Sequence, residues 1–410
     1  MKLYRIAARN IRRNKRRSVL SCTAIAAAVM GIVFFSAYLK GMQGDLKKNL
    51  VTYYTGEIRV QHSDYERYDY LNPLHLRIES FRELVREIET HEAVSLVSPR
   101  IGFPAAVYRD EETHHAWGVG VDFDVEREFQ DLDSHLMEGR VPDEGRNEAL
   151  LGVGLAKEIG VGTGDKITVM TTTMRRGTNA VTFLVTGLVR LPVGELNGAW
   201  ILAPLDRVQR LVRMGDSVSE ILIKLEDGAS AEKTARELEA DLGTEQAKEL
   251  TFRTWQEGNT SYGFIKMAGM VYNFISLFFF VLASTVIVNT TMMVVFERVR
   301  EIGTIGALGM TRGEIVRLFF LEALYLGVIG SGIGVALGIG ITIPLTFTGI
   351  DLSSALQGVS FEVSNRIYPS VNPGLTVLAF VYSVAVAGLA SLIPSGRAAR
   401  IEPSEALRSI

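Results

Sequence analysis

Four long stretches of apolar residues constrain this chain more than any other feature of its sequence. They cover residues 18–40, 264–296, 315–347 and 371–394. A helix needs about 20 predominantly apolar residues to cross the hydrocarbon core of a bilayer, and each stretch is long enough. The sequence therefore predicts an α-helical membrane protein with four transmembrane helices.

Basic residues mark one side of these stretches. Lysine and arginine form a run before the first stretch, and arginines recur in residues 297–314 and after the fourth stretch, whereas only Arg366 is basic between the third and the fourth. Because lysine and arginine gather in cytoplasmic loops, we expect both chain ends and residues 297–314 to be cytoplasmic. Residues 41–263 and 348–370 are then extracytoplasmic, so the large domain lies outside the cytoplasm.

Residues 1–17 have the pattern of a helix that lies on a membrane surface. Leu3, Ile6, Ala7 and Ile11 recur at helical spacing with basic residues between them, as in amphipathic interfacial helices. A basic run also occurs in nucleic-acid binders, but the formal net charge of −3 and the apolar stretch that follows argue against that function. We expect residues 395–410 to form a cytoplasmic tail.

Residues 41–263 are predicted to form a large α/β extracytoplasmic domain made of two β-α-β units and an inserted β-rich lobe. Ser80 and Glu83 form a capping-box pattern at the start of the first helix. The lobe, at about 100–216, is rich in short strands separated by glycine turns. Two β-α-β units commonly fold together as one sheet backed by two helices. The expected strand, helix and strand are 56–60, 80–90 and 93–97 in one unit and 218–225, 231–242 and 250–255 in the other; in the lobe we expect strands at 105–108, 116–121, 166–170 and 181–189 and a helix at 207–214.

This domain offers little chemistry. His114 and His115 are adjacent, so they point apart on a strand, and we expect them to be solvated rather than to bind a metal. The sequence has no serine elbow, no HExxH pattern and no GxxxxGK[ST] pattern. We therefore expect no catalytic residue, no metal site and no cofactor bound by this chain.

Glycines recur in the third apolar stretch. Gly330, Gly334 and Gly338 lie four residues apart, on one face of a helix. Since glycine has no side chain, it lets two helices approach closely in a membrane. The spacing does not fit a nucleotide-binding glycine loop, and no strand precedes it. We interpret these glycines as a helix-packing face.

Residues 297–314 predict two helices that meet at a tight turn. Gly309 is placed to end the first helix. Thr311 and Glu314 form a capping box at the start of the next one. The turn would lie at the cytoplasmic surface, directly after the second apolar stretch.

The first of these helices carries an apolar stripe. Ile302, Ile305 and Leu308 are spaced three residues apart and would lie on one face, with charged residues beside them. Such a stripe fits a protein partner. It fits equally well a segment that lies on the lipid headgroups, and the pattern alone does not separate the two.

The run Arg300-Glu301-Ile302-Gly303, followed by Ala307-Leu308-Gly309 and Arg312, resembles the coupling segment of the MacB, FtsX and lipoprotein-releasing family of ABC permeases. The run from Pro394 to Arg408 is similar to the closing pattern of that family. The order of elements also matches: a basic helix, one span, a domain of this size and three more spans. Gly306 departs from the family, in which a basic residue is common at this position.

The resemblance implies a permease subunit and not an enzyme. A separate cytoplasmic ATPase subunit would bind ATP and Mg, and a second permease chain, identical or different, would complete the transporter. Within the family the resemblance is strongest to the lipoprotein-releasing permeases of the LolC and LolE type, which implies a lipoprotein substrate. The alternatives are efflux of a small molecule or peptide from the periplasm, and a signalling permease that regulates a cell-wall hydrolase. The residues implied to contact the ATPase are Arg300, Glu301, Ile302, Gly303, Ile305, Ala307, Leu308 and Gly309.

Two further sets of residues are candidates for function. Glu322 is a charge inside the third apolar stretch; we expect it either to pair structurally with Arg298 or Arg317 or to act in coupling. Aromatic residues of the first and second stretches could line a path for acyl chains or could simply face lipid. They include Phe34, Phe35, Tyr38, Phe274 and Phe278.

Overall fold

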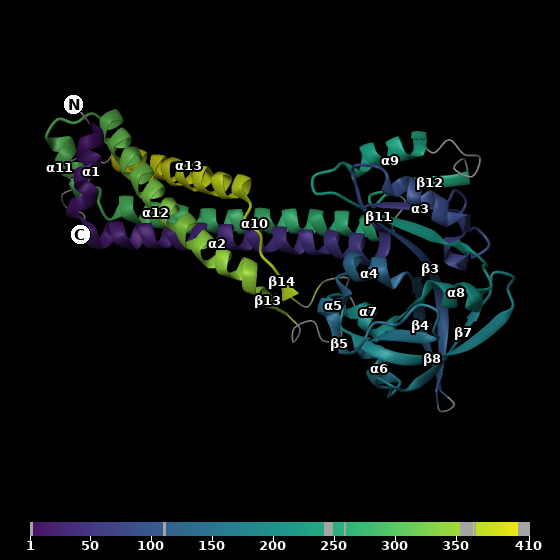
Figure 1. Cartoon of the computed structure of the whole chain (residues 1–410). Helices are drawn as coiled ribbons and strands as arrows, with labels where there is room; N and C mark the ends of the chain where they lie inside the picture. The colour runs from purple at the N-terminus through teal and green to yellow at the C-terminus, as the bar shows by residue number, and fades with distance from the viewer. Residues whose placement is uncertain are drawn as a thin grey trace. The chain divides into compact units, whose positions relative to one another are not determined.

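The computed structural model describes residues 3–109, 112–241, 249–257, 260–352, 364 and 366–400. These residues belong to two compact units (Figure 1). The helical unit comprises residues 1–44, 267–351 and 367–410, and the sheet unit comprises residues 45–266 and 352–366. Residues 353–363 and 365 of the expected extracytoplasmic loop and residues 401–410 of the expected tail lie outside this description.

Long helices make up the helical unit. Four of them are long and apolar enough to cross a membrane, which confirms the fold class predicted from the sequence. The first is longer than its apolar stretch at both ends. The helices are α1 (Leu3–Arg13), α2 (Lys15–Asn49), α10 (Thr260–Phe296), α11 (Val299–Ala307), α12 (Arg312–Thr348) and α13 (Pro373–Ala398). The last residues of α2, 45–49, and the first residues of α10, 260–266, belong to the sheet unit.

The glycine face of α12 packs against α2, as the sequence predicts. A Cβ atom added to Gly334 would lie 2.6 Å from the carbonyl oxygen of Ala26 and 2.8 Å from the Cβ of Val29. A Cβ atom added to Gly330 or to Gly338 would lie 2.9 Å from a side chain of α2. The two helix backbones can approach to this distance only because these positions carry no side chain.

The sheet unit contains the two expected β-α-β units. The four strands of these units lie in the order β12-β1-β11-β3, and every neighbouring pair is antiparallel. This order interleaves the two units, as in ferredoxin-like folds. Both helices pack on one hydrophobic core with these strands. The first unit is β1 (Ile58–His62), α3 (Phe81–Glu89) and β3 (Val94–Arg109); the second is β11 (Glu220–Leu225), α9 (Ala231–Asp241) and β12 (Leu250–Thr254).

The inserted lobe continues the same sheet. Its strands extend the order from β3 through β4-β9-β6-β8-β5, with β7 pairing to both β3 and β8. Side chains alternate along β9: Ile201 belongs to the core that holds α3 and α9, and Leu202 to a second core. Since alternate residues of a strand point to opposite faces, the sheet has a core on each face. The strands are β4 (Glu112–Val121), β5 (Leu136–Gly139), β6 (Glu148–Gly152), β7 (Lys166–Thr172), β8 (Thr178–Val189) and β9 (Trp200–Pro204).

Short helices cover both faces of the lobe. Phe123, Leu132 and Leu196 place α4, α5 and α7 on the second core, whereas Val208 places α8 on the first. The bounds of these helices and of the remaining short elements of the chain are α4 (Phe123–Phe129), α5 (Leu132–His135), α6 (Val153–Glu158), α7 (Gly194–Ala199), α8 (Leu205–Val212), η1 (Leu50–Thr55), η2 (Glu66–Leu71), β2 (Ile78–Glu79), β10 (Ser217–Val218), β13 (Ile350–Asp351) and β14 (Arg366–Ile367).

Two local predictions are wrong. The strands expected at 93–97 and 105–108 are one continuous strand, β3, because its second half pairs with β4 and β7 while its first half pairs with β11. The capping box at Ser80 does not form: Ser80 has a φ of 51° and its side chain makes no cap hydrogen bond. The pairing of β2 with β10 ends at Glu79, next to this residue, and fixes how the chain enters α3.

The close approach of α2 and α12 gives a testable prediction. Gly334→Ala should destabilise the protein by about 1–3 kcal/mol, the usual cost of overpacking a tight interface, because the added methyl group would overlap Ala26 and Val29. Gly332→Ala is the matched control, since nothing lies within 4 Å of its added Cβ. Thermal unfolding in detergent measures both. Equal stability of the two variants would contradict this packing.

Candidate functional site

The segment between α10 and α12 has the predicted turn. Helix α11 ends at Ala307, and Gly309 follows with a φ of 94°, a conformation that favours glycine. The capping box at the start of α12 is confirmed: the Glu314 N–H donates to Thr311 Oγ1 at 3.4 Å and the Thr311 N–H donates to the Glu314 carboxylate at 3.0 Å. The turn is therefore held by its own hydrogen bonds.

The apolar stripe expected on α11 is divided between two surfaces. Ile302 is only 2% exposed and belongs, with Ile305 packed against it, to a small core that includes Ile315 and Phe319 of α12. Leu308 is 83% exposed. The single outward stripe is thus wrong, because the helix ends at Ala307 and the turn directs Leu308 away from that core.

The outward surface of this segment is therefore a different set of residues. Arg300, Thr304, Ala307, Leu308 and Gly309 are exposed. The first three follow helical spacing, i, i+4 and i+7, so they share one face of α11, and Leu308 and Gly309 follow directly at the turn. Of the predicted coupling residues, Gly303 is buried with Ile302, and Glu301 is partly exposed beside Arg298. We call the exposed set the α11 outer face.

A buried ion pair lies directly behind the α11 outer face. The guanidinium of Arg298, at the start of α11, donates to Oε2 of Glu322 on α12. The same guanidinium donates to Glu301 at 2.8 Å and lies 5.1 Å from the ring of Phe319. Of the two arginines that the sequence offered, Arg298 is the one in contact with Glu322.

The other oxygen of Glu322 binds the N-terminal helix. Asn10 Nδ2 on α1 donates to Glu322 Oε1 at 2.6 Å. The carboxylate thus connects α1, α12 and the start of α11, three helices that lie together in the helical unit (Figure 1). Sequence reasoning missed Asn10. The signal was present, because Asn10 follows Leu3, Ile6 and Ala7 by seven, four and three residues and so shares the apolar face of the helix.

This pair is costly to break. Arg298 and Glu322 are each about 5% exposed, so both charges are desolvated. An intact buried pair contributes little net stability, but removing one partner leaves an uncompensated charge and costs several kcal/mol. The pair therefore fixes how α11 is attached to α12.

The structure divides the aromatic candidates into two groups. Phe35 of α2 stacks on Phe279 of α10 with ring centroids 4.0 Å apart, and Tyr38 lies 6.2 Å from Phe35. Phe34 is half-buried. Phe274 and Phe278 lie on the other side of α10, where they are 72% and 54% exposed. Only the last two present an open aromatic surface.

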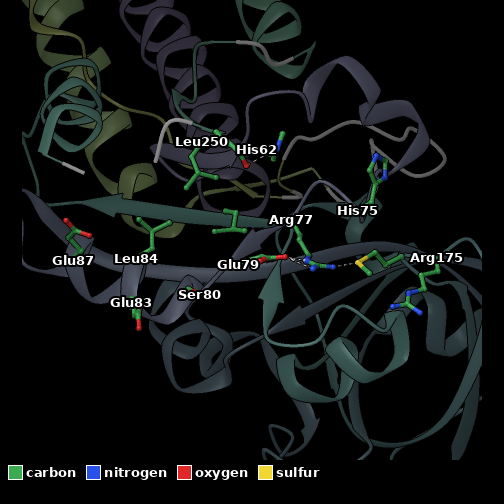
Figure 2. A pocket seen from close by; sticks show the side chains of 13 residues that line it. His62, His75, Arg77, Glu79, Ser80, Glu83, Leu84, Glu87, Arg175 and Leu250 are labelled. Atoms are coloured by element: carbon green, nitrogen blue, oxygen red, sulfur yellow. Dashed lines mark hydrogen bonds and ion pairs between the residues drawn. The ribbon is translucent and has the colours of Figure 1, made fainter. Parts of the chain in front are cut away.

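The sheet unit has a groove of about 560 Å³ between α3, β2 and the β7–β8 turn. Figure 2 shows its charged lining. Arg77 donates to Glu79 at 3.0 Å, and His62 lies 3.9 Å from Glu249. Arg175 lines the groove too. Side chains of both signs suit a polar ligand and not an acyl chain, whose burial against them would leave charges unsolvated.

One histidine of the adjacent pair, His114, is not in the solvated state expected from the sequence. Its Nδ1 lies 3.1 Å from Glu158, and its Nε2 lies 3.6 Å from Glu112. Among the described residues, no group of three or more histidine, cysteine or acidic residues could hold a metal ion. The contact joins β4 to α6.

Two family models match the chain. Residues 18–241 match the MacB-like periplasmic core domain, and residues 273–403 match the FtsX-like permease C-terminal model. Among solved structures, the periplasmic region of MacB from Actinobacillus actinomycetemcomitans aligns with a TM-score of 0.37 and 14% identity, covering 49% of this chain and 90% of that one.

Curated relatives match over different lengths. The lipoprotein-releasing system transmembrane protein LolC of Neisseria meningitidis is 24% identical over 97% of this chain and 96% of its own length. LolE of Haemophilus influenzae is 25% identical over 81% of this chain and 82% of its own. The macrolide export protein MacB of Bordetella avium is 34% identical, but over 30% of this chain and 16% of its own.

The buried pair gives a prediction that a single and a double variant test together. Arg298→Met should destabilise the protein by about 3–5 kcal/mol, because Glu322 is left charged and buried. Arg298→Met combined with Glu322→Leu should recover most of that loss. Arg317→Met is the control, since Arg317 is an exposed arginine of α12, the helix that carries Glu322. Thermal unfolding in detergent measures all three, and a double variant no more stable than Arg298→Met would refute the pairing.

Proposed function

This chain belongs to the family of ABC transporter permeases that have a MacB-like periplasmic core domain and an FtsX-like C-terminal region, and we propose from that premise that it releases lipoproteins from the inner membrane. It is a multi-pass membrane protein with a periplasmic-type domain, and ATP hydrolysis belongs to a partner subunit. The proposed reaction extracts a lipid-anchored protein from the outer leaflet of the inner membrane.

The lengths of the matches support this choice of substrate. The LolC and LolE relatives are similar over most of both chains, so the likeness includes the membrane helices and the periplasmic domain together. The MacB relative is similar over less than a third of this chain. Efflux of a small molecule and signalling to a cell-wall hydrolase are therefore the less supported alternatives. A second permease chain, identical or different, would complete the complex.

The proposed contact with the ATPase is the α11 outer face. Leu308 offers an exposed apolar side chain, and Arg300 and Thr304 border it. A partner that covers Leu308 with apolar surface would remove its side chain from water, and that burial favours association. The basic residues of the chain ends and of residues 297–314 support a cytoplasmic position for this face by the charge rule for membrane proteins, where ATP and Mg would be available to the partner.

The proposed path for acyl chains is the exposed aromatic surface of α10. Phe274 and Phe278 lie at the periphery of the helical unit, whereas the groove of the sheet unit is lined by charges. Apolar chains are transferred from lipid at little cost to other apolar surface. The protein part of the substrate, which is polar, would contact the sheet unit.

The substrate proposal is tested on the complex purified with its ATPase partner in nanodiscs. Mass spectrometry should find triacylated or diacylated proteins bound in the absence of ATP. Adding ATP and Mg should lower the bound amount, and a non-hydrolysable ATP analogue, which allows binding without turnover, is the control. Recovery of small molecules with no acylated protein would overturn lipoprotein release in favour of efflux.

The contact proposal is tested by Leu308→Asp. A charge at the centre of the interface should weaken ATPase binding by about tenfold or more, while thermal unfolding of the permease stays unchanged, because Leu308 contacts solvent in the free chain. Leu71→Asp is the matched control, since Leu71 is an exposed leucine of the sheet unit. Wild-type ATPase affinity in Leu308→Asp would exclude this surface as the contact.

A further inference from the structure

The first transmembrane helix ends inside the sheet unit and not in water. Helix α2 runs to Asn49 and passes directly into η1, a π-helical turn whose residues Leu50, Tyr53 and Thr55 are buried. The carbonyl groups of the last turn of a helix have no partners within the helix. Each one buried without a donor would cost about 1–3 kcal/mol. The sheet unit must therefore supply donors.

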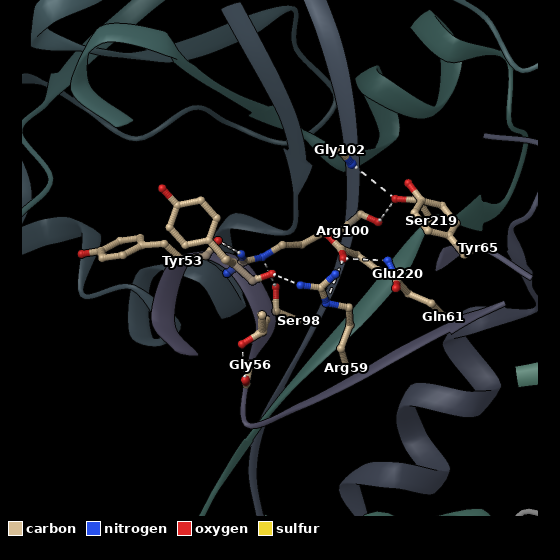
Figure 3. Close-up of polar contacts among 12 residues, drawn as sticks. Tyr53, Gly56, Arg59, Gln61, Tyr65, Ser98, Arg100, Gly102, Ser219 and Glu220 are labelled. Atoms are coloured by element: carbon tan, nitrogen blue, oxygen red, sulfur yellow. Dashed lines mark hydrogen bonds and ion pairs between the residues drawn. The ribbon is translucent and has the colours of Figure 1, made fainter. Parts of the chain in front are cut away.

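All five carbonyl oxygens from Leu50 to Tyr54 receive a donor. Figure 3 shows two of the donors, Arg59 and Arg100, with Tyr53. The next residues along the chain provide donors for the first two: Thr55 Oγ1 donates to the Leu50 carbonyl at 3.3 Å, and the Gly56 N–H donates to the Val51 carbonyl at 2.9 Å. The last three depend on two arginines from elsewhere in the sequence. Arg100 donates to Thr52 at 3.5 Å and to Tyr53 at 3.0 Å, and Arg59 donates to Tyr54 at 3.0 Å.

Arg100 is itself fixed in the sheet unit. It lies on β3, is 1% exposed and pairs with Glu126 of α4, which is fully buried. Ser98 donates to the same carboxylate at 2.6 Å. The ring of Phe129 lies 5.1 Å from the guanidinium. A charge with this many partners has one orientation, because turning away would leave several buried groups unsatisfied.

Arg59 forms the second attachment. It lies on β1, and its Nε is 3.7 Å from a carboxylate oxygen of Glu220 on β11. Burial raises the pKa of Glu220, and Arg59 and Arg100 oppose that shift. Gln61 donates to the same carboxylate at 3.3 Å. Since β1, β11 and β3 are neighbours in the sheet, the helix end is bonded through two arginines to three adjacent strands.

Electrostatics strengthen this attachment. The C-terminal end of a helix carries a partial negative charge, and a cation there is stabilising, most of all where water is excluded. Tyr53 and Tyr54 also make edge contacts with Trp200 of β9, each with ring centroids 6.2 Å apart. Near the start of α10 there are aromatic and cation–π contacts. The ring of Trp255 lies 5.0 Å from the Lys47 ammonium and 5.4 Å from the ring of Tyr262.

We propose that Arg59 and Arg100 form a stiff joint through which α2 moves the periplasmic sheet when the partner ATPase acts. A helix whose end is bonded to three strands turns the sheet with it, and a helix that ends in a loop does not. Both arginines are positioning residues, because they act through the end of η1 that they hold. The proposal rests on the proposed function only in that ATP hydrolysis supplies the motion.

The test measures the stiffness of the joint directly. Spin labels at Lys48→Cys on α2 and Lys157→Cys on α6, both exposed, report the distance between the helix end and the sheet unit in a Cys22→Ser chain. The complex with its ATPase is placed in nanodiscs. The joint variant is Arg100→Gln with Glu126→Gln, which removes both charges and leaves neither unpaired. Arg140→Gln with Glu148→Gln is the matched control, because that pair, 2.6 Å apart, lies elsewhere in the same unit.

The wild-type and control complexes should give one narrow distance distribution, with and without ATP and Mg. The joint variant should give a broad one. Its ATP hydrolysis should persist, while the amount of lipoprotein released per ATP should fall by about tenfold, within the usual range of coupling between sites. Arg100→Lys, which keeps the charge, should recover part of the release.

Three results would overturn the joint: a narrow distribution in the joint variant, a broad one in the control, or a broad one in the joint variant with release per ATP unchanged. If the wild-type complex releases no lipoprotein, the proposed function fails, and the distance distributions still decide whether the two arginines stiffen the joint. The two failures are therefore distinguishable.

Discussion

Buried polar groups need partners wherever water is excluded, and the arrangement of this protein depends on how that need is met. In the bilayer the backbone is satisfied only by continuous helices, and α2 and α12 come close enough to touch because glycines line their contact. Helix ends and charged side chains also need partners. In each unit a buried arginine and a buried glutamate provide them, Arg298 with Glu322 and Arg100 with Glu126.

Each pair lies at one attachment site of the proposed coupling, one pair in each unit. Arg298 and Glu322 attach the start of α11 to α12 and, through Asn10, to α1. Arg100 and Glu126 attach the end of η1 to the sheet. Buried ion pairs add little stability compared with apolar side chains of the same volume, so stability does not account for them. Their effect is to hold each helix in one geometry. The proposed coupling requires this, because a displacement of one element reaches the next only through a rigid attachment.

The sequence predicted what depends on local pattern. Length and apolar composition gave the spanning helices, and Thr311 with Glu314 gave the start of α12, because a capping box is complete within four residues. The two β-α-β units could be inferred from alternation, but not that β3 is one strand, since its two halves have different partners far along the chain. The partners of Arg100 were equally beyond reach, because they follow from the sheet pairing and from where η1 ends. At Ser80 a matching pattern failed, because the adjacent strand pairing controls the backbone there.

The division of the apolar stripe on α11 has a physical reason that bears on coupling. A helix of nine residues is too short to be stable in water alone, so α11 must dock on something before it can present a surface. Ile302 provides that docking inside the protein, and Arg298 fixes its direction. Had Ile302, Ile305 and Leu308 all faced a partner, the helix would have had no attachment of its own, and a push on it would have been lost in local unfolding. Under the proposed contact, the inward Ile302 and Ile305 keep the short helix attached to α12, while the outward Leu308 binds the ATPase.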